Sequence, residues 1–172
     1  MHELFTKLIA DGFVIPIVLL GAWALLTKIP TKEKYHAYSR ILMAGLTAFL
    51  MAKLIASVYQ PETMRPFEKL GIDAGAAFLN NPGFPSDHTL FCMAITLAVW
   101  FEARQRKLAY VLAGLTILVA VGRVVALVHT PLDVVGGIAI AFLGVPWYLQ
   151  REKHKHNKLV KDTREIHKKR VQ

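Results

Sequence analysis

The chain has 172 residues, of which 54% are hydrophobic and only 19% are charged, so it is too apolar for an ordinary soluble domain. Its net charge of +9 is uneven, because residues 151–172 hold nine Lys or Arg against three acidic residues and contribute +6. A basic tail directly after an apolar segment is typical of a topology signal or of contact with anionic lipid headgroups, which argues against nucleic-acid binding.

Five apolar segments follow one another within residues 1–150, and we expect them to form one all-α transmembrane bundle. A spanning helix needs roughly 20 mostly apolar residues. The segments run Phe13–Leu26, Ile41–Tyr59, Thr89–Phe101, Leu108–Leu127 and Pro131–Leu149. The third reaches spanning length only if its polar start, at Ser86, lies at the membrane surface. Ahead of the first, Leu4, Phe5, Leu8 and Ile9 have the spacing of an amphipathic turn that suits the membrane interface.

The charges of the connecting loops predict how the five spans are oriented. The connections 27–40 and 102–107, together with the tail 151–172, hold 16 of the 21 Lys and Arg residues. Five spans place these three regions on one side, which the positive-inside rule assigns to the cytoplasm. We therefore expect the N-terminus, the loop 60–88 and the turn near His129 to face the exterior.

One motif stands between the fourth and fifth segments, from Gly122 to Asp133. Pro131 suits the first position of a new helix, which places His129 just before that helix and Asp133 in its first turn. A carboxylate there can accept a hydrogen bond from one imidazole nitrogen and leave the other free to attack. Arg123 lies on the other side of the turn.

Two further polar clusters fall on the same predicted face. Phe-Pro-Ser-Asp-His-Thr, residues 84–89, opens the third segment, where Ser86 suits the N-cap and His88 suits a general acid. Exposed amide groups at a helix start also bind phosphate oxygens. Arg65 and Arg123 provide two guanidinium groups, which suit the charge that develops on equatorial oxygens during phosphoryl transfer.

These pieces in this order resemble the type-2 phosphatidic acid phosphatase superfamily: Arg65-Pro66, then Pro-Ser-x-His ending at His88, then Arg-x5-His-x3-Asp ending at Asp133. The resemblance implies a helical bundle and a reaction through a phosphohistidine, without metal or cofactor. His129 would be the nucleophile, oriented by Asp133, with His88 as general acid. Ser86, Arg65 and Arg123 would bind the phosphate.

The chain departs from the family pattern at three positions. The lysine expected seven residues before Arg65 is Val58, and Lys53 lies further back in the second apolar segment, from where it can extend toward the site. The third motif usually opens with Ser-Arg and here opens with Gly122-Arg123. Asp87 replaces the usual glycine of the second motif, and it would cap the third helix or pair with an arginine.

The sequence Phe-Pro-Ser-Asp-His-Thr resembles the branch that contains bacterial undecaprenyl pyrophosphate phosphatases. This resemblance implies an enzyme of the bacterial inner membrane whose site faces the exterior, with Asp87 and Lys53 as possible substrate contacts. Phosphatidic acid, phosphatidylglycerophosphate and lipid A phosphate remain alternative substrates. A lipid-dependent phosphotransferase and a non-catalytic lipid carrier are the rival functions, and the oligomeric state stays open.

Overall fold

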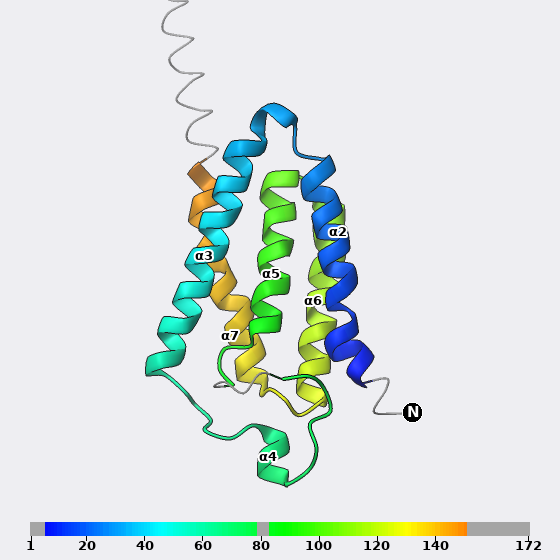
Figure 1. Ribbon diagram of the computed structural model, residues 1–172, viewed down its shortest axis with the longest axis vertical. Helices are drawn as coiled ribbons and strands as arrows, with labels where there is room; N and C mark the ends of the chain where they lie inside the picture. Colours follow the sequence, from blue (N-terminus) through cyan, green and yellow to red (C-terminus); the bar gives the residue numbers. More distant parts are fainter. Residues whose placement is uncertain (1–5, 79–82, 151–172) are drawn as a thin grey trace, which may run out of the picture.

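The computed structural model describes residues 6–78 and 83–150, and all of the regular structure in these ranges is helical. The chain rises and descends as a bundle of long helices (Figure 1). The elements are η1 (Leu8–Gly12), α2 (Val14–Thr27), η2 (Thr31–Glu33), α3 (Lys34–Val58), α4 (Pro66–Leu70), α5 (Asp87–Ala98), η3 (Val99–Ala103), α6 (Arg106–Val125), α7 (Pro131–Ala141) and η4 (Phe142–Gly144). The predicted all-α bundle is confirmed.

Four helices in the described ranges are long and apolar enough to cross a membrane, namely Leu8–Thr27, Thr31–Val58, Arg106–Val125 and Pro131–Gln150. They correspond to four of the five predicted segments. The remaining segment forms α5 and η3, which are shorter. Leu8 and Ile9 are part of the first spanning helix and not of a separate interfacial helix, because η1 runs directly into α2. Leu4, Phe5 and the tail 151–172 lie outside the described residues.

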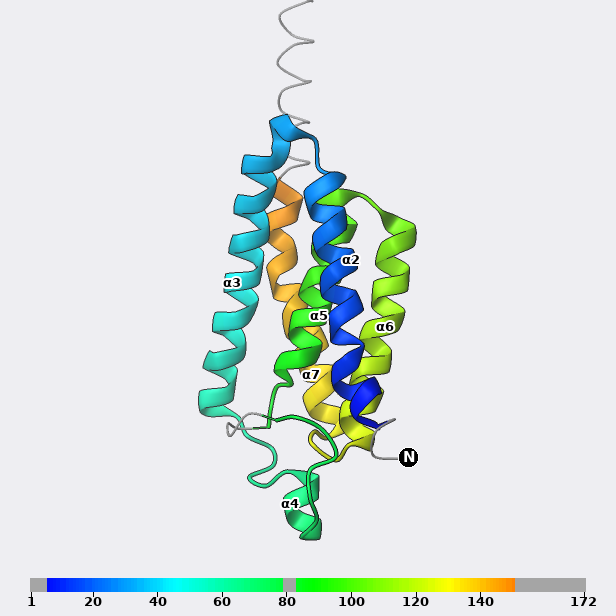
Figure 2. The same ribbon diagram turned by 45° about the vertical axis from the view of Figure 1, so that its right-hand side comes forward.

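Helix α5 stands at the centre of the bundle and packs against α2, α3, α6 and α7 (Figure 2). Because protein surrounds it, α5 buries residues on several faces, including Thr89, Cys92 and Thr96. The outer helix α3 buries only a row of alanines, at positions 37, 44, 48 and 52. Its large apolar side chains point outward, as expected where lipid is the surrounding solvent.

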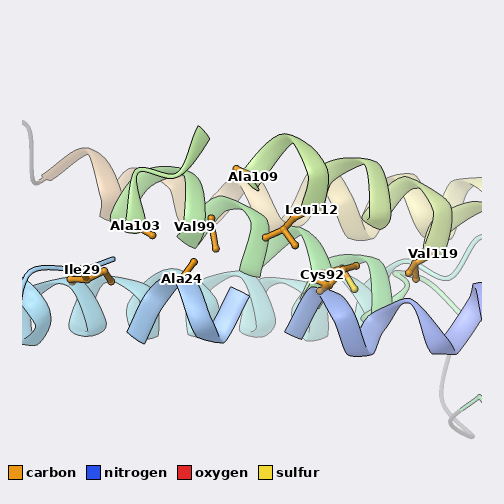
Figure 3. Close-up of a cluster of buried hydrophobic side chains, with 10 residues drawn as sticks. Ala24, Ile29, Cys92, Val99, Ala103, Ala109, Leu112 and Val119 are labelled. Carbon is orange, nitrogen blue, oxygen red and sulfur yellow. The ribbon is translucent and has the colours of Figure 1, made fainter. Parts of the chain in front are cut away.

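The core between α2, α5 and α6 is made of small and aliphatic side chains, including Ala24, Cys92, Val99 and Leu112 (Figure 3). Close approach of the helices also depends on glycines. A Cβ atom on Gly144 would lie 2.6 Å from the Ala44 carbonyl oxygen of α3. These small side chains and glycines let the helices pack closely.

The bundle has two chemically different ends. Residues 28–33, 104–105 and the last described residue, Gln150, lie at one end, while η1, the α3–α5 connection and the α6–α7 turn lie at the other (Figure 1). All three predicted motifs therefore meet at one end of the bundle. Which side of a membrane this end faces remains a prediction.

Candidate active site

The turn between α6 and α7 holds His129 by backbone hydrogen bonds. The amides of Val128 and His129 both donate to the Arg123 carbonyl, at 3.3 Å each. Leu127 adopts a left-handed conformation with φ of 59°, which is uncommon for a branched side chain and is typical of constrained functional turns. The turn therefore returns the chain tightly and leaves His129 at the head of α7.

Asp133 is placed by the start of α7, where Pro131 occupies the first turn as predicted. Its Oδ2 accepts a hydrogen bond from the Thr130 amide at 2.8 Å, and its own amide donates to Thr130 Oγ1 at 3.2 Å. This reciprocal capping box fixes the carboxylate. The same Oδ2 lies 3.4 Å from His129 Nδ1, an ion-pair distance that is long for a hydrogen bond.

The His129 imidazole is 5% exposed. Burial is the main cause that lowers the pKa of His129 from its usual value of 6.5; Arg123 and Arg65 act in the same direction, and Asp133 opposes them. The neutral form is therefore favoured near pH 7. Since Nδ1 faces Asp133, Nε2 is the nitrogen left for attack on an electrophile.

The start of α5 is joined directly to the start of α7. The Ser86 amide donates to the Asp133 carbonyl at 2.9 Å, and Thr89 Oγ1 lies 3.1 Å from the Val134 carbonyl. Gly137 permits this contact, because a Cβ there would fall 2.5 Å from the Ser86 carbonyl oxygen. Ser86 occupies the predicted N-cap position, but its side chain makes no capping hydrogen bond.

Two arginines approach from other elements. Arg65 precedes α4, is 7% exposed, and donates from Nη1 to the Val128 carbonyl at 2.5 Å, next to His129. Burial lowers the pKa of Arg65 from 12.5, with Glu68 as the first of the opposing charges, so the guanidinium remains charged at neutral pH. Arg123, on α6, is 1% exposed.

Buried polar atoms without a partner in the described part of the chain gather at this end. They are Ser86 Oγ, Arg123 Nε, His129 Nδ1 and Asp133 Oδ1. Buried donors are normally satisfied, and unsatisfied ones are costly. A serine hydroxyl and a guanidinium N–H beside a buried imidazole suit an anionic group with several acceptor oxygens, such as phosphate.

Lys53 and Asp87 form an ion pair at the same end, with Nζ 3.0 Å from Oδ1 and 3.2 Å from Oδ2. Asp87 thus pairs with a lysine on α3, a partner that the sequence analysis did not assign to it. Val58, where the family pattern has its lysine, is 80% exposed on the outer surface. Lys53 thus reaches the site region from more than one helical turn away.

His88 lies in the first turn of α5, within electrostatic range of Arg123 and His129. A carboxylate that the sequence analysis did not identify accompanies it. Asp11 Oδ1, from η1, lies 2.7 Å from Arg123 Nη1 and 3.9 Å from His88 Nε2. The available signal was an acidic residue at the edge of the first apolar segment, which alone is typical of an interfacial position.

Two hollows adjoin these residues. A cavity of about 460 Å³ opens on the loop side, where Arg65, Thr130 and Asp133 contribute to its wall. An apolar groove of about 660 Å³ runs between α3 and α5 from Asp87 toward Tyr148, past Gly45, Phe49 and Leu90. The groove therefore connects the polar end of the bundle with its lipid-facing side.

Metal-ligating side chains do not cluster in the described ranges, where no group of three or more His, Cys, Asp or Glu residues is arranged to hold an ion. The site is built instead from two histidines, two arginines, a serine and carboxylates.

The fold and the site together define a multi-pass membrane protein of the PAP2 class, and the comparisons with known proteins agree. The sequence matches the PAP2 superfamily over residues 34–156, and the chain belongs to this superfamily. It is 30% identical over 128 residues to undecaprenyl-diphosphatase BcrC of Bacillus subtilis (strain 168), a match that covers 74% of this chain and 62% of that protein. No solved structure matches the chain.

Proposed function

We propose that this protein is a membrane lipid phosphatase that hydrolyses undecaprenyl diphosphate to undecaprenyl phosphate, with His129 as nucleophile. The observation that carries the proposal is the convergence of Ser86, Arg123 and His129 at one end of the bundle, with buried polar atoms left unpartnered. The name of the Bacillus subtilis relative supports the choice of substrate.

The reaction proceeds in two displacements. His129 Nε2 attacks the terminal phosphorus, the bond from that phosphorus to the bridging oxygen breaks, and His88 gives its proton to the departing oxygen. Water then attacks phospho-His129, His88 takes the proton of that water, and inorganic phosphate leaves. Both imidazoles end in their starting states, and no metal takes part.

The phosphate-binding groups act on the charge of the transferring phosphoryl group. Ser86 Oγ and the two guanidinium groups donate hydrogen bonds to its oxygens, and Asp133 holds the tautomer of His129 that leaves Nε2 unprotonated. Lys53, held by Asp87, contributes a positive charge where the lipid diphosphate enters. This contact takes the place of the lysine that position 58 lacks.

The lipid tail lies in the apolar groove between α3 and α5. The groove begins at Asp87, beside the site, and its wall is otherwise almost entirely apolar. A long isoprenoid or acyl chain placed there keeps contact with the bilayer while its headgroup reaches the polar end. The lining does not distinguish one chain from another, so the substrate alternatives are separated by experiment.

The site faces the exterior of a bacterial plasma membrane, with the C-terminal tail in the cytoplasm. The support is that the connections 27–40 and 102–107, with seven Lys or Arg between them, lie at the opposite end of the bundle from the site. A reporter fused after residue 172 that is active only in the cytoplasm tests this orientation. A reporter active only outside the membrane would contradict it.

The central experiment measures phosphate release by the full-length protein in detergent with excess chelator. Undecaprenyl diphosphate and phosphatidic acid are compared, with His129→Ala as the test variant and His36→Ala, an exposed histidine at the other end, as the matched control. We expect release from undecaprenyl diphosphate, abolished only by His129→Ala. Faster release from phosphatidic acid would overturn the substrate, and activity in His129→Ala would overturn the mechanism.

The rival functions give different products. A phosphotransferase requires an acceptor other than water, so it would release no free phosphate when that acceptor is missing. A carrier would bind the lipid without turnover. Either result with folded wild-type protein would contradict the hydrolase.

A further inference from the structure

The first helix contributes a charged group to a site otherwise built from later segments. Asp11 Oδ1 lies 2.7 Å from Arg123 Nη1, and its Oδ2 accepts a hydrogen bond from the Ala77 amide at 2.9 Å. The Ala77 carbonyl in turn accepts from Arg123 Nη1 at 2.7 Å. Asp11 therefore anchors one nitrogen of the Arg123 guanidinium, while Nε of the same group has no partner in the described ranges.

Asp11 reaches this position because α6 has no side chain at residue 122. A Cβ atom on Gly122 would fall 2.7 Å from the Ala10 amide nitrogen and 2.8 Å from Ile9 Cγ2. Real Cβ atoms do not approach so closely, so any larger residue would move η1 away from α6. Gly122 stands where the motif usually has a serine. Its missing side chain makes room for η1, and so for the contact between Asp11 and Arg123.

Asp11 also faces the second histidine. His88 Nε2 is 3.9 Å from Asp11 Oδ1. The other charged or titratable groups that act on His88 are Arg123 from α6, His129 from the α6–α7 turn and Asp87 beside it on α5. Burial is the main cause that lowers the pKa of His88 from 6.5 to about 4, and Arg123 acts in the same direction, whereas the carboxylate of Asp11 raises this pKa.

We propose that Asp11 is a positioning residue that orients the Arg123 guanidinium and favours the protonated form of His88, from which a proton passes to the leaving oxygen. This inference rests on the proposed function and adds to it a group from outside the residues that match the superfamily, 34–156. Asp11 exchanges no proton with the substrate. Its charge acts on His88, and its Oδ1 acts on Arg123.

The alternative is that Asp11 only neutralises a buried arginine. An ion pair with that role alone affects folding and the overall rate, but it leaves the pH dependence unchanged. A general acid must be protonated to act, so the alkaline limb of the kcat/KM profile reports His88. The pH profile therefore separates the two roles.

The test compares wild type, Asp11→Asn and Gly122→Ala, assayed for phosphate release from undecaprenyl diphosphate across the pH range. Asp11→Asn keeps an oxygen for Arg123 but removes the charge. Gly122→Ala keeps Asp11 and displaces η1, which provides an independent variant if the first fails to fold. Asp73→Asn, an exposed carboxylate of the loop at the same end, is the matched control.

We expect both test variants to move the alkaline limb to lower pH by about one unit, with the acid limb and the Asp73→Asn profile unchanged. Ionisation of the lipid is common to every variant and cancels in the comparison. Alkaline limbs that stay at the wild-type pH in both variants would overturn the role of Asp11 while leaving a His129-dependent phosphatase intact. A wild type without His129-dependent release would overturn the proposed function itself.

Discussion

Gly137 of α7 lies directly against the backbone of Ser86, so that the start of α5 and the start of α7 touch without an intervening side chain. The same approach allows the Ser86 amide to donate to the Asp133 carbonyl. One glycine therefore sets the separation between the serine of the second motif and the carboxylate of the third.

Gly137→Ala is expected to reduce kcat for phosphate release at least tenfold, because a Cβ would push the two helix starts apart. The stability cost of such overpacking is about 1–3 kcal/mol. Both quantities are measured on purified protein, by phosphate release and by thermal unfolding. Gly114→Ala is the control, since a Cβ on Gly114 meets nothing within 4 Å. Equal activity in the two variants would refute the role of the contact.

The acid limb of the kcat/KM profile is expected to lie below pH 6.5, because burial lowers the pKa of His129 and the nucleophile must be neutral. Activity should hold as pH falls to 6.5 and decline below it. The free energy of unfolding should also decrease as pH falls below 6.5. Below 6.5 the unfolded chain binds a proton that the folded site resists, so folding weakens as pH falls toward the folded-state pKa. An acid limb above pH 6.5 would contradict a buried His129 whose pKa is lowered.

Filling the groove between α3 and α5 is expected to discriminate against long lipid tails. Gly45 lines the groove and has open space beyond it, so Gly45→Leu adds bulk without a clash inside the protein. We expect KM for undecaprenyl diphosphate to rise several-fold, with hydrolysis of a short-chain water-soluble diphosphate unchanged. Gly114→Leu, on the surface of α6, is the matched control. A uniform effect on both substrates would argue that the tail binds elsewhere.

Lys53→Met is expected to raise KM for a lipid diphosphate about tenfold, because it removes a cation that lies beside the entering headgroup and pairs with Asp87. Asp87→Asn in the same chain should restore part of the loss. A double-mutant cycle on KM measures this coupling. Strictly additive effects of the two substitutions would show that the pair does not act as a unit.

At the other end of the bundle, Glu102→Gln is expected to lower stability by about 3 kcal/mol without a change in KM. Glu102 is 2% exposed and accepts two hydrogen bonds from Arg40, at 2.6 and 2.8 Å, so the change removes the charged partner of a part-buried guanidinium. Thermal unfolding in detergent measures the loss. Glu62→Gln is the control, because its pair with Lys69 is exposed and contributes at most about 1 kcal/mol. Equal losses of stability in Glu102→Gln and Glu62→Gln would contradict the difference between the buried pair and the exposed pair.

The sequence predicted the fold and the meeting of the motifs because both follow from local signals. Long apolar runs define the helices, and their alternation places Arg65, Ser86 and His129 at one end. The central position of α5 was not predictable, since an enclosed helix and a lipid-facing helix are both apolar. The short length of this segment was visible in the sequence. Its enclosure by α2, α3, α6 and α7 depends on how the helices pack and was not.

Asp11 was missed for a related physical reason. Its contact with Arg123 depends on an interhelical approach at Gly122, and nothing within the first segment indicates which helix it will touch. The Lys53–Asp87 pair was partly predictable, because both residues stood out in the sequence but their contact did not. The two departures from the family pattern were visible separately, and only the placement of α3 beside the start of α5 shows that each residue satisfies the other.

The shortness of α5 has a consequence for depth in the bilayer. The twelve residues of α5 and the five of η3 rise about 25 Å, which is less than the roughly 30 Å of a hydrocarbon core. The central helix therefore ends below the headgroup plane on at least one side. Each of its ends carries an ion pair to α3: Asp87 with Lys53 at the site and Glu102 with Arg40 opposite. The long outer helix thus supplies the counter-charge for one acidic residue at each end of the short inner segment.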